Sequence, residues 1–123
     1  MKRIYVAGAY SAGNVIGVLD NMREGMRLST EVMLAGFAPF CPWLDYHFQL
    51  MLREGENLSV DDYYQYSLEW LEASNAVLLV PGWESSKGTI AEIERAGYWG
   101  IPVFKTLESV IMYFSGHEIG GAE

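Results

Sequence analysis

Short aliphatic runs alternate along this chain with longer stretches in which apolar residues recur every three or four positions. The runs at residues 4–7 and 77–80 are typical of strands buried on both faces, as in a parallel sheet. Residues 37–41 and 101–104 predict two further strands, and Pro39 favours an edge position for the former. Because strand and helix patterns alternate, the order predicts one α/β domain over residues 1–123 with a mostly parallel sheet.

The first helical pattern begins near residue 15 and should end at Gly36. Its apolar residues form one stripe that we expect to pack in the core: Val15, Leu19, Met22, Met26 and Met33. A third helix is expected over residues 89–99 and a short last one over 107–114. Residues 42–57 should be irregular, and the glycine-rich tail at 115–123 is expected to be loose or exchanged with a neighbouring copy.

The second helix should begin at Ser59, whose spacing from Asp62 predicts a capping box, and run to about residue 74. Its expected core face consists of Val60, Tyr64, Ser67 and Leu71. A neighbouring face carries three large aromatic residues: Tyr63, Tyr66 and Trp70. So much apolar surface on one helix favours a homo-oligomer interface or a ligand wall.

The densest candidate chemistry lies between residues 77 and 92. A strand stops at Pro81 and Gly82, and two serines, Lys87, Gly88 and a helix N-terminus follow. Backbone amides at such an end favour an anionic or polyhydroxylated ligand. Ligands of parallel sheets bind beyond the carboxyl ends of the strands, so the loops after residues 7, 41 and 80 should converge on one pocket.

The amino-acid composition limits the kinds of partner and cofactor that we expect for this protein. The 123 residues carry 16 acidic and eight basic side chains, a formal charge of −8, so long nucleic acid is not expected as a partner. No apolar run is long enough to cross a membrane, and there is no signal pattern, so a cytoplasmic protein is expected. Cys41, His47 and His117 lack zinc-ligand spacing, and the nucleotide-binding glycine motifs are missing. We therefore expect neither metal nor cofactor.

Glu92 allows two interpretations. Thr89 and Glu92 have the spacing of a capping box, in which the glutamate bonds back to the cap amide. Alternatively, a carboxylate at the ligand edge of a sheet can attack an anomeric carbon and form a covalent glycosyl intermediate. Likewise Ser86 is either a loop or cap residue or a ligand contact, and Lys87 is by default a solvated charge.

Several segments together resemble the nucleoside 2-deoxyribosyltransferase superfamily, most closely the branch of deoxynucleoside 5′-monophosphate N-glycosidases and small phage-type relatives. The resemblance covers roughly residues 2–113. It is carried by IYVAG at residues 4–8, LAGFAPF at 34–40, WLEASNAV at 70–77 and GTIAEIERA at 88–96. It implies a flavodoxin-like or Rossmann-like three-layer sandwich of about four or five strands.

Carried over by position, the resemblance implies that Glu92 is the nucleophile and that Tyr5 orients it. Ser86 falls where monophosphate-specific members bind the 5′-phosphate, and Gly8 lies in the first ligand-facing loop. Lys87 and Gly88 are expected to assist there, and Trp43 or Tyr10 could stack on the base. The implied activity is cleavage or transfer of the N-glycosidic bond of a (deoxy)nucleoside or its 5′-monophosphate, without a cofactor.

The sequence departs from the family at two positions, and one of them is Asn75, where the family has an aspartate after the alanine. Where the family has an aspartate before its W-L motif, this chain has Ser67, which cannot donate a proton comparably. Asp45, Asp61 and Asp62 are candidate replacements. The alternatives are thus a slow hydrolase, an enzyme with a relocated acid, or a nucleotide-binding protein that senses or sequesters its ligand without catalysis.

Overall fold

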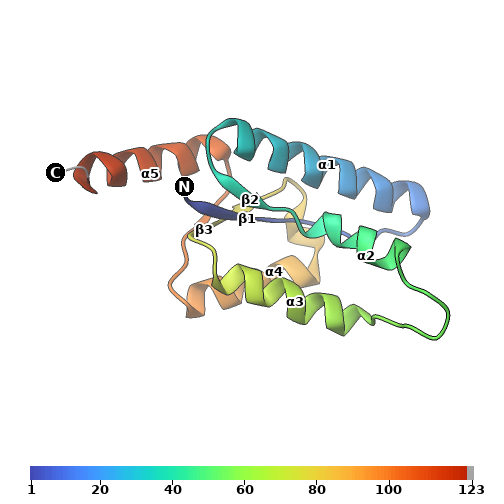
Figure 1. The fold of residues 1–123 in the computed structure, drawn as a ribbon. Helices are drawn as coiled ribbons and strands as arrows, with labels where there is room; N and C mark the ends of the chain where they lie inside the picture. The colour runs from blue at the N-terminus through green and yellow to red at the C-terminus, as the bar shows by residue number, and fades with distance from the viewer. Residues whose placement is uncertain (122–123) are drawn as a thin grey trace.

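A four-stranded parallel sheet forms the centre of the computed structural model, which describes residues 1–121 (Figure 1). The strand order is β2-β1-β3-β4, with all three pairings parallel. The strands are β1 (Arg3–Ala7), β2 (Ala38–Phe40), β3 (Ala76–Leu79) and β4 (Val103–Phe104). The α/β prediction is confirmed, and Pro39 lies on the edge strand β2, where a missing amide donor is tolerated.

Helices cover both faces of the sheet. One face packs against α1 (Val15–Leu34) and α5 (Leu107–Gly121), and the other against α3 (Val60–Glu72) and α4 (Lys87–Tyr98) (Figure 1). Because side chains alternate along a strand, Ile4 and Val6 of β1 join the first core and Tyr5 and Ala7 the second. The chain is therefore the three-layer sandwich that the resemblance implied.

The apolar stripe of α1 was predicted correctly only at its centre. Met22 is buried there and Met26 packs against the core, but Val15 is 72% exposed and Met33 65% exposed. A helix of 20 residues spans about 30 Å, whereas a five-residue strand spans about 17 Å. The ends of α1 therefore extend beyond the sheet, and their apolar residues have no strand to cover.

Other element boundaries also differ from the prediction. The expected irregular stretch contains the short helices η1 (Pro42–Asp45) and α2 (Tyr46–Leu50), and α5 continues through Gly121 instead of ending near residue 114. Residues 122–123 of the predicted tail lie outside the described residues. The capping box of α3 is confirmed at Ser59, but Val60, expected in the core, is 87% exposed because it begins the first turn, beyond the sheet. Gly36 ends α1 with a φ of +94°, as predicted.

Candidate active site

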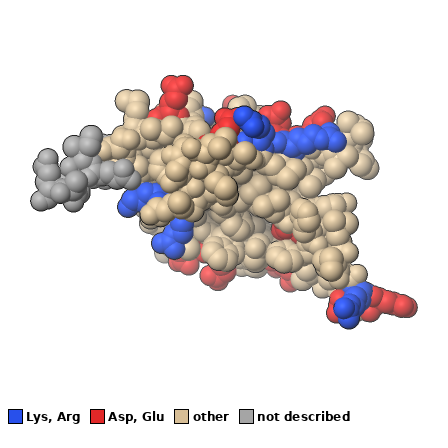
Figure 2. All heavy atoms as spheres, turned by 45° about the horizontal axis from the view of Figure 1, so that its top comes forward, with Lys and Arg blue, Asp and Glu red and all other residues tan. Residues whose placement is uncertain are grey.

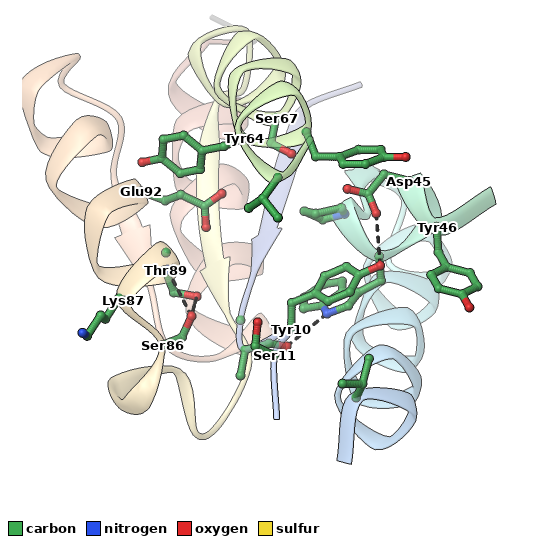
Figure 3. Close-up of a pocket in the computed structure, with 18 of the residues that line it drawn as sticks. Tyr10, Ser11, Asp45, Tyr46, Tyr64, Ser67, Ser86, Lys87, Thr89 and Glu92 are labelled. Atoms are coloured by element: carbon green, nitrogen blue, oxygen red, sulfur yellow. Dashed lines mark hydrogen bonds between the residues drawn. The ribbon is translucent and has the colours of Figure 1, made fainter. Parts of the chain in front are cut away.

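The carboxyl ends of the strands open into one large cleft. Its volume is about 880 Å³, within the range of roughly 300–1,000 Å³ that is common for small-molecule sites. It is lined by the loop after β1, by η1 and α2, by α3, and by the first turns of α4 (Figure 3). The loops after residues 7, 41 and 80, which were predicted to meet at one pocket, all contribute residues to this cleft.

Glu92 and Tyr5 form a buried pair at the base of this cleft. Tyr5 lies on the central strand β1 and is fully buried, and Glu92, in the second turn of α4, is 8% exposed and lines the cleft. The Tyr5 hydroxyl donates a hydrogen bond to Oε2 of Glu92. A rigid strand thus fixes one oxygen of the carboxylate, and the side chain as a whole faces the cavity (Figure 3).

The capping interpretation of Glu92 is wrong. Helix α4 begins at Lys87, two residues earlier than predicted, and its N-cap is Ser86. The Ser86 hydroxyl oxygen accepts hydrogen bonds from the Thr89 amide at 3.2 Å and from the Thr89 hydroxyl at 2.9 Å. Glu92 is therefore six residues beyond the cap, which places its carboxyl group out of the capping arrangement and beside Tyr5.

Burial raises the pKa values of both Tyr5 and Glu92. Desolvation raises the pKa of Glu92 to about 7, opposed by the hydrogen bond from Tyr5. The pKa of Tyr5 is raised by burial first and then by the Glu92 charge, with a hydrogen bond to Ser67 acting in the opposite direction. Tyr5 therefore stays a neutral donor, and Glu92 is a poorly solvated carboxylate at and above neutral pH. Such a carboxylate can act as a nucleophile.

A second carboxylate, Asp45, lies across the cleft from Glu92 (Figure 3). It ends η1 and accepts a hydrogen bond from the Tyr10 hydroxyl at 3.3 Å. Partial burial raises the pKa of Asp45, and the bond from Tyr10 lowers it. Of the candidate acids, Asp45 alone lines the cleft, because Asp61 is exposed and Asp62 caps α3 by accepting from the Ser59 amide at 2.8 Å.

Trp43 of η1 lines the cleft and is 1% exposed. Its indole N–H donates to the Ala9 carbonyl at 3.1 Å, which ties η1 to the loop after β1. Gly25 of α1 leaves the space for the ring, because a Cβ there would lie 2.3 Å from Trp43. Gly8 allows a similar close approach, since its Cβ would lie 2.7 Å from the Val80 Cβ.

The other predicted site residues also reach the cleft. Ser67, Ser86, Lys87 and Gly88 line it, although the Lys87 ammonium group is exposed and points away from Glu92 (Figure 3). Tyr63 lines it too, so the ligand-wall interpretation holds for this member of the aromatic face. Tyr66 and Trp70 do not line it, and instead pack against Phe40.

Sequence reasoning missed part of the lining. Tyr46, Gln49, Leu58 and Thr89 were not predicted there, and Tyr64 was assigned to the core. Tyr46 and Gln49 are three residues apart and share one side of α2. The three-residue spacing could have predicted that both side chains face the same way, but only if residues 46–50 had been recognised as a helix.

On the face drawn in Figure 2, lysine and arginine groups lie at several places rather than in one patch. Among the side chains that the structure describes, residues 1–115, no cluster of three or more potential metal ligands occurs. Within the same part of the chain, no helix is long and apolar enough to cross a membrane.

Comparison with known proteins supports the fold. The structure is similar to that of a 2-deoxyribosyltransferase from the psychrotolerant bacterium Bacillus psychrosaccharolyticus, with a TM-score of 0.60 and 18% sequence identity. The match covers 82% of this chain and 69% of that chain. No curated protein sequence matches the chain. Residues 2–105 match the family described as "Domain of unknown function (DUF4406)", and the chain belongs to that family.

Proposed function

We propose that this protein cleaves or transfers the N-glycosidic bond of a (deoxy)nucleoside or its 5′-monophosphate, with Glu92 as the nucleophile. The observation that carries the proposal is the buried Glu92 carboxyl group, held by Tyr5 and facing a cleft of nucleotide size. The structurally similar 2-deoxyribosyltransferase supports the choice of substrate class.

In the proposed reaction a Glu92 oxygen bonds to C1′ of the sugar as the bond from C1′ to the base breaks. Glycosidic bonds break through an oxocarbenium-like transition state, which a neighbouring carboxylate stabilises and then traps as a glycosyl ester. Water releases the free sugar from this ester, and a second base releases a new nucleoside. Tyr5 orients Glu92 throughout by its hydrogen bond.

The substrate would lie along the cleft, with its sugar or phosphate at one end and its base at the other. Ser86, Gly88 and Thr89 line the end at the α4 N-terminus, where hydroxyl groups and a helix dipole suit the 5′-hydroxyl or 5′-phosphate. Tyr10 and Trp43 line the other end, where the partly exposed Tyr10 offers aromatic surface for the base, whereas Trp43 is 1% exposed and offers almost none. The exposed Lys87 can contribute only at the rim, to a phosphate that extends out of the cleft.

Chromatography of a panel of nucleosides and 5′-monophosphates tests the proposal. Wild type should release a free base, and Glu92→Ala should release none while unfolding at a similar temperature. Adding a second free base to the same reaction separates transfer, which yields a new nucleoside, from hydrolysis, which yields the sugar. Base release that is unchanged in Glu92→Ala would contradict the mechanism.

The competing function is a protein that binds a nucleotide without cleaving it. Ser67 favours it, because this residue lines the cleft where related enzymes have an aspartate. This alternative predicts a ligand-induced rise in the unfolding temperature with no base released over long incubation. The same panel, followed by thermal unfolding with each member, distinguishes the two functions.

We also propose that the protein is a homo-oligomer. Tyr66 and Trp70 of α3 are 37% and 48% exposed, and Phe48 of α2, which packs against Tyr66, is 50% exposed. Burying this aromatic surface against a second copy would remove it from water. Light scattering at micromolar concentration should give a mass above that of one chain, and Trp70→Glu should lower it. A monomeric wild type would contradict this proposal.

A further inference from the structure

The two ends of the cleft differ in chemistry, and the difference fixes where a base would lie. Helix α4 brings Glu92 together with the hydroxyls of Ser86 and Thr89 on one side, and the β1–α1 loop and η1 bring Tyr10 and Asp45 on the other (Figure 3). If Glu92 contacts C1′ and the sugar extends toward Ser86, the base must extend toward the aromatic side. Asp45 is the carboxyl group on that side.

We propose that Asp45 is the acid that protonates the departing base, with Tyr10 as the residue that positions it. The inference rests on the proposed function and assigns the proton donor for which Ser67 is unsuitable. It stands on three observations: Asp45 lines the cleft, it faces Glu92 across the cavity, and the Tyr10 hydroxyl holds one of its oxygens at 3.3 Å. Among the described residues, none forms a hydrogen bond with the other oxygen, which faces the side on which we place the base.

Partial burial raises the pKa of Asp45 and so shifts it toward its protonated form, and the hydrogen bond from Tyr10 acts in the opposite direction. The ionisable groups that interact with it are Tyr10, Tyr63 and Cys41, which are uncharged at neutral pH. In the described part of the chain, the cationic residue that lines the cleft is Lys87, which points outward on the opposite side. Burial already raises the pKa of Asp45, and a base stacked over it would exclude more water and raise that pKa further.

The proposed reaction has two steps, and the proton that Asp45 gives up in the first step returns to it in the second. First, a Glu92 oxygen bonds to C1′, the C1′–N bond breaks with its electron pair passing to the base, and the Asp45 proton moves to the base. The base leaves neutral and Asp45 becomes a carboxylate. Second, Asp45 takes a proton from water as the water oxygen bonds to C1′ and the ester bond to Glu92 breaks. Both carboxyl groups then return to their starting forms.

Leaving-group chemistry tests this assignment. A purine methylated at N7 is already cationic and departs without needing a proton, so its release should not depend on Asp45. We would measure kcat and KM for 2′-deoxyguanosine and 7-methyl-2′-deoxyguanosine, each as the nucleoside and the 5′-monophosphate, corrected for uncatalysed loss of the base. The variants are Asp45→Asn, Tyr10→Phe, Glu92→Ala and, as a matched control, Asp61→Asn on the exposed surface of α3.

Asp45→Asn should lower kcat for the unmethylated substrate by about 10²–10⁴-fold, with less than about tenfold change for the methylated one. Tyr10→Phe should show the same selectivity with a smaller loss, and Asp61→Asn should match wild type. Retained turnover of the methylated substrate also shows that Asp45→Asn, Tyr10→Phe and Asp61→Asn are folded, and a thermal unfolding transition shows the same for Glu92→Ala. Equal losses on both substrates would overturn the role of Asp45 and leave that of Glu92 standing. No Glu92-dependent release of either base by wild type would overturn both.

Discussion

The two faces of the sheet are built from the same strands but differ in what they bury. On the α1 and α5 face, Ile4, Val6 and Leu78 pack among apolar side chains. On the α3 and α4 face, the neighbouring strand residue Tyr5 is fully buried beside Glu92, with Ser67 and Thr89 also buried nearby. Alternation along one short strand therefore gives one face to packing and the other to candidate chemistry.

The comparison locates a cost in folding stability on the α3 and α4 face. A buried carboxyl group with a raised pKa destabilises the folded state whenever it must ionise, because it loses water without gaining an opposite charge. On the opposite face the buried hydroxyl of Ser29 is satisfied by the Gly25 carbonyl at 2.8 Å and carries no charge. Removing the charge of Glu92 and adding a methyl group to the packed apolar face should therefore have opposite effects on stability.

The largest effect is expected for Glu92→Gln. Base release should fall by roughly a thousandfold or more, because an amide is not a nucleophile for C1′. The same variant should be more stable at pH 8, by up to about 3 kcal/mol, since it no longer has to ionise a buried group. Urea unfolding of wild type and variant at pH 4 and pH 8 measures the difference.

The sign of this pH dependence follows from the two pKa values. The folded pKa of about 7 lies above the unfolded value of 4.5, so folded protein binds more protons between them. Glu92 therefore costs no stability below about pH 4.5, and its cost grows as the pH rises to about 7. A stability gain in Glu92→Gln that is equal at pH 4 and pH 8 would contradict this account.

On the apolar face, Gly25→Ala should destabilise the protein by about 1–3 kcal/mol. Alanine is the better helix former, but its Cβ would lie 2.3 Å from the Trp43 ring, which is fixed by its bond to the Ala9 carbonyl. Gly97→Ala in α4 is the matched control, because no packing neighbour among residues 1–121 lies within 4 Å of the position that its Cβ would take, and it should stabilise by up to about 1 kcal/mol. Denaturant unfolding measures both, and equal effects would refute the role of Trp43.

The same contrast explains how far the sequence predicts this molecule. Aliphatic runs and helical spacing predicted the strands, the sheet class and the capped start of α3, because those signals are local and repeated. The resemblance placed Tyr5 and Glu92 together, and the structure contains that pair. The start of α4 was misassigned because Ser86 and Thr89 are both acceptable caps, and only the packing of the α4 face decides between them.

Asp45 shows what the sequence could not decide. Three aspartates were candidate acids, and only the role of Asp62 could be read from its spacing, because its capping bond to Ser59 crosses three residues and was predicted. The position of Asp45 in the cleft arises because η1 turns it toward the Tyr10 hydroxyl. That contact joins residues 35 positions apart in the chain, which hydrophobic periodicity does not encode.

A smaller effect is expected for Tyr5→Phe, which keeps the ring on the polar face and removes the donor to Glu92. The hydrogen bond from Tyr5 lowers the Glu92 pKa, so its loss should raise that pKa above about 7. Less Glu92 would be ionised at pH 7, and kcat/KM should fall about tenfold there and largely recover at pH 9. A pH–rate profile measures this, and a loss of equal size at every pH would mean that Tyr5 acts only by orienting Glu92.

The smallest effect should come from Ser86→Ala, at the mouth of the cleft. Its hydroxyl oxygen caps α4 by accepting from the Thr89 amide, and Thr89 is 1% exposed, so water does not replace the lost partner. The variant should lose about 1 kcal/mol of unfolding free energy. Ser85→Ala is the matched control, since this exposed neighbour bonds only to the Gly82 carbonyl at 3.1 Å and should cost less than about 0.5 kcal/mol. If the two variants unfold at the same urea concentration, the hydroxyl of Ser86 does not stabilise α4, and its place in the cleft is then explained by ligand contact alone, which a higher KM in Ser86→Ala would reveal.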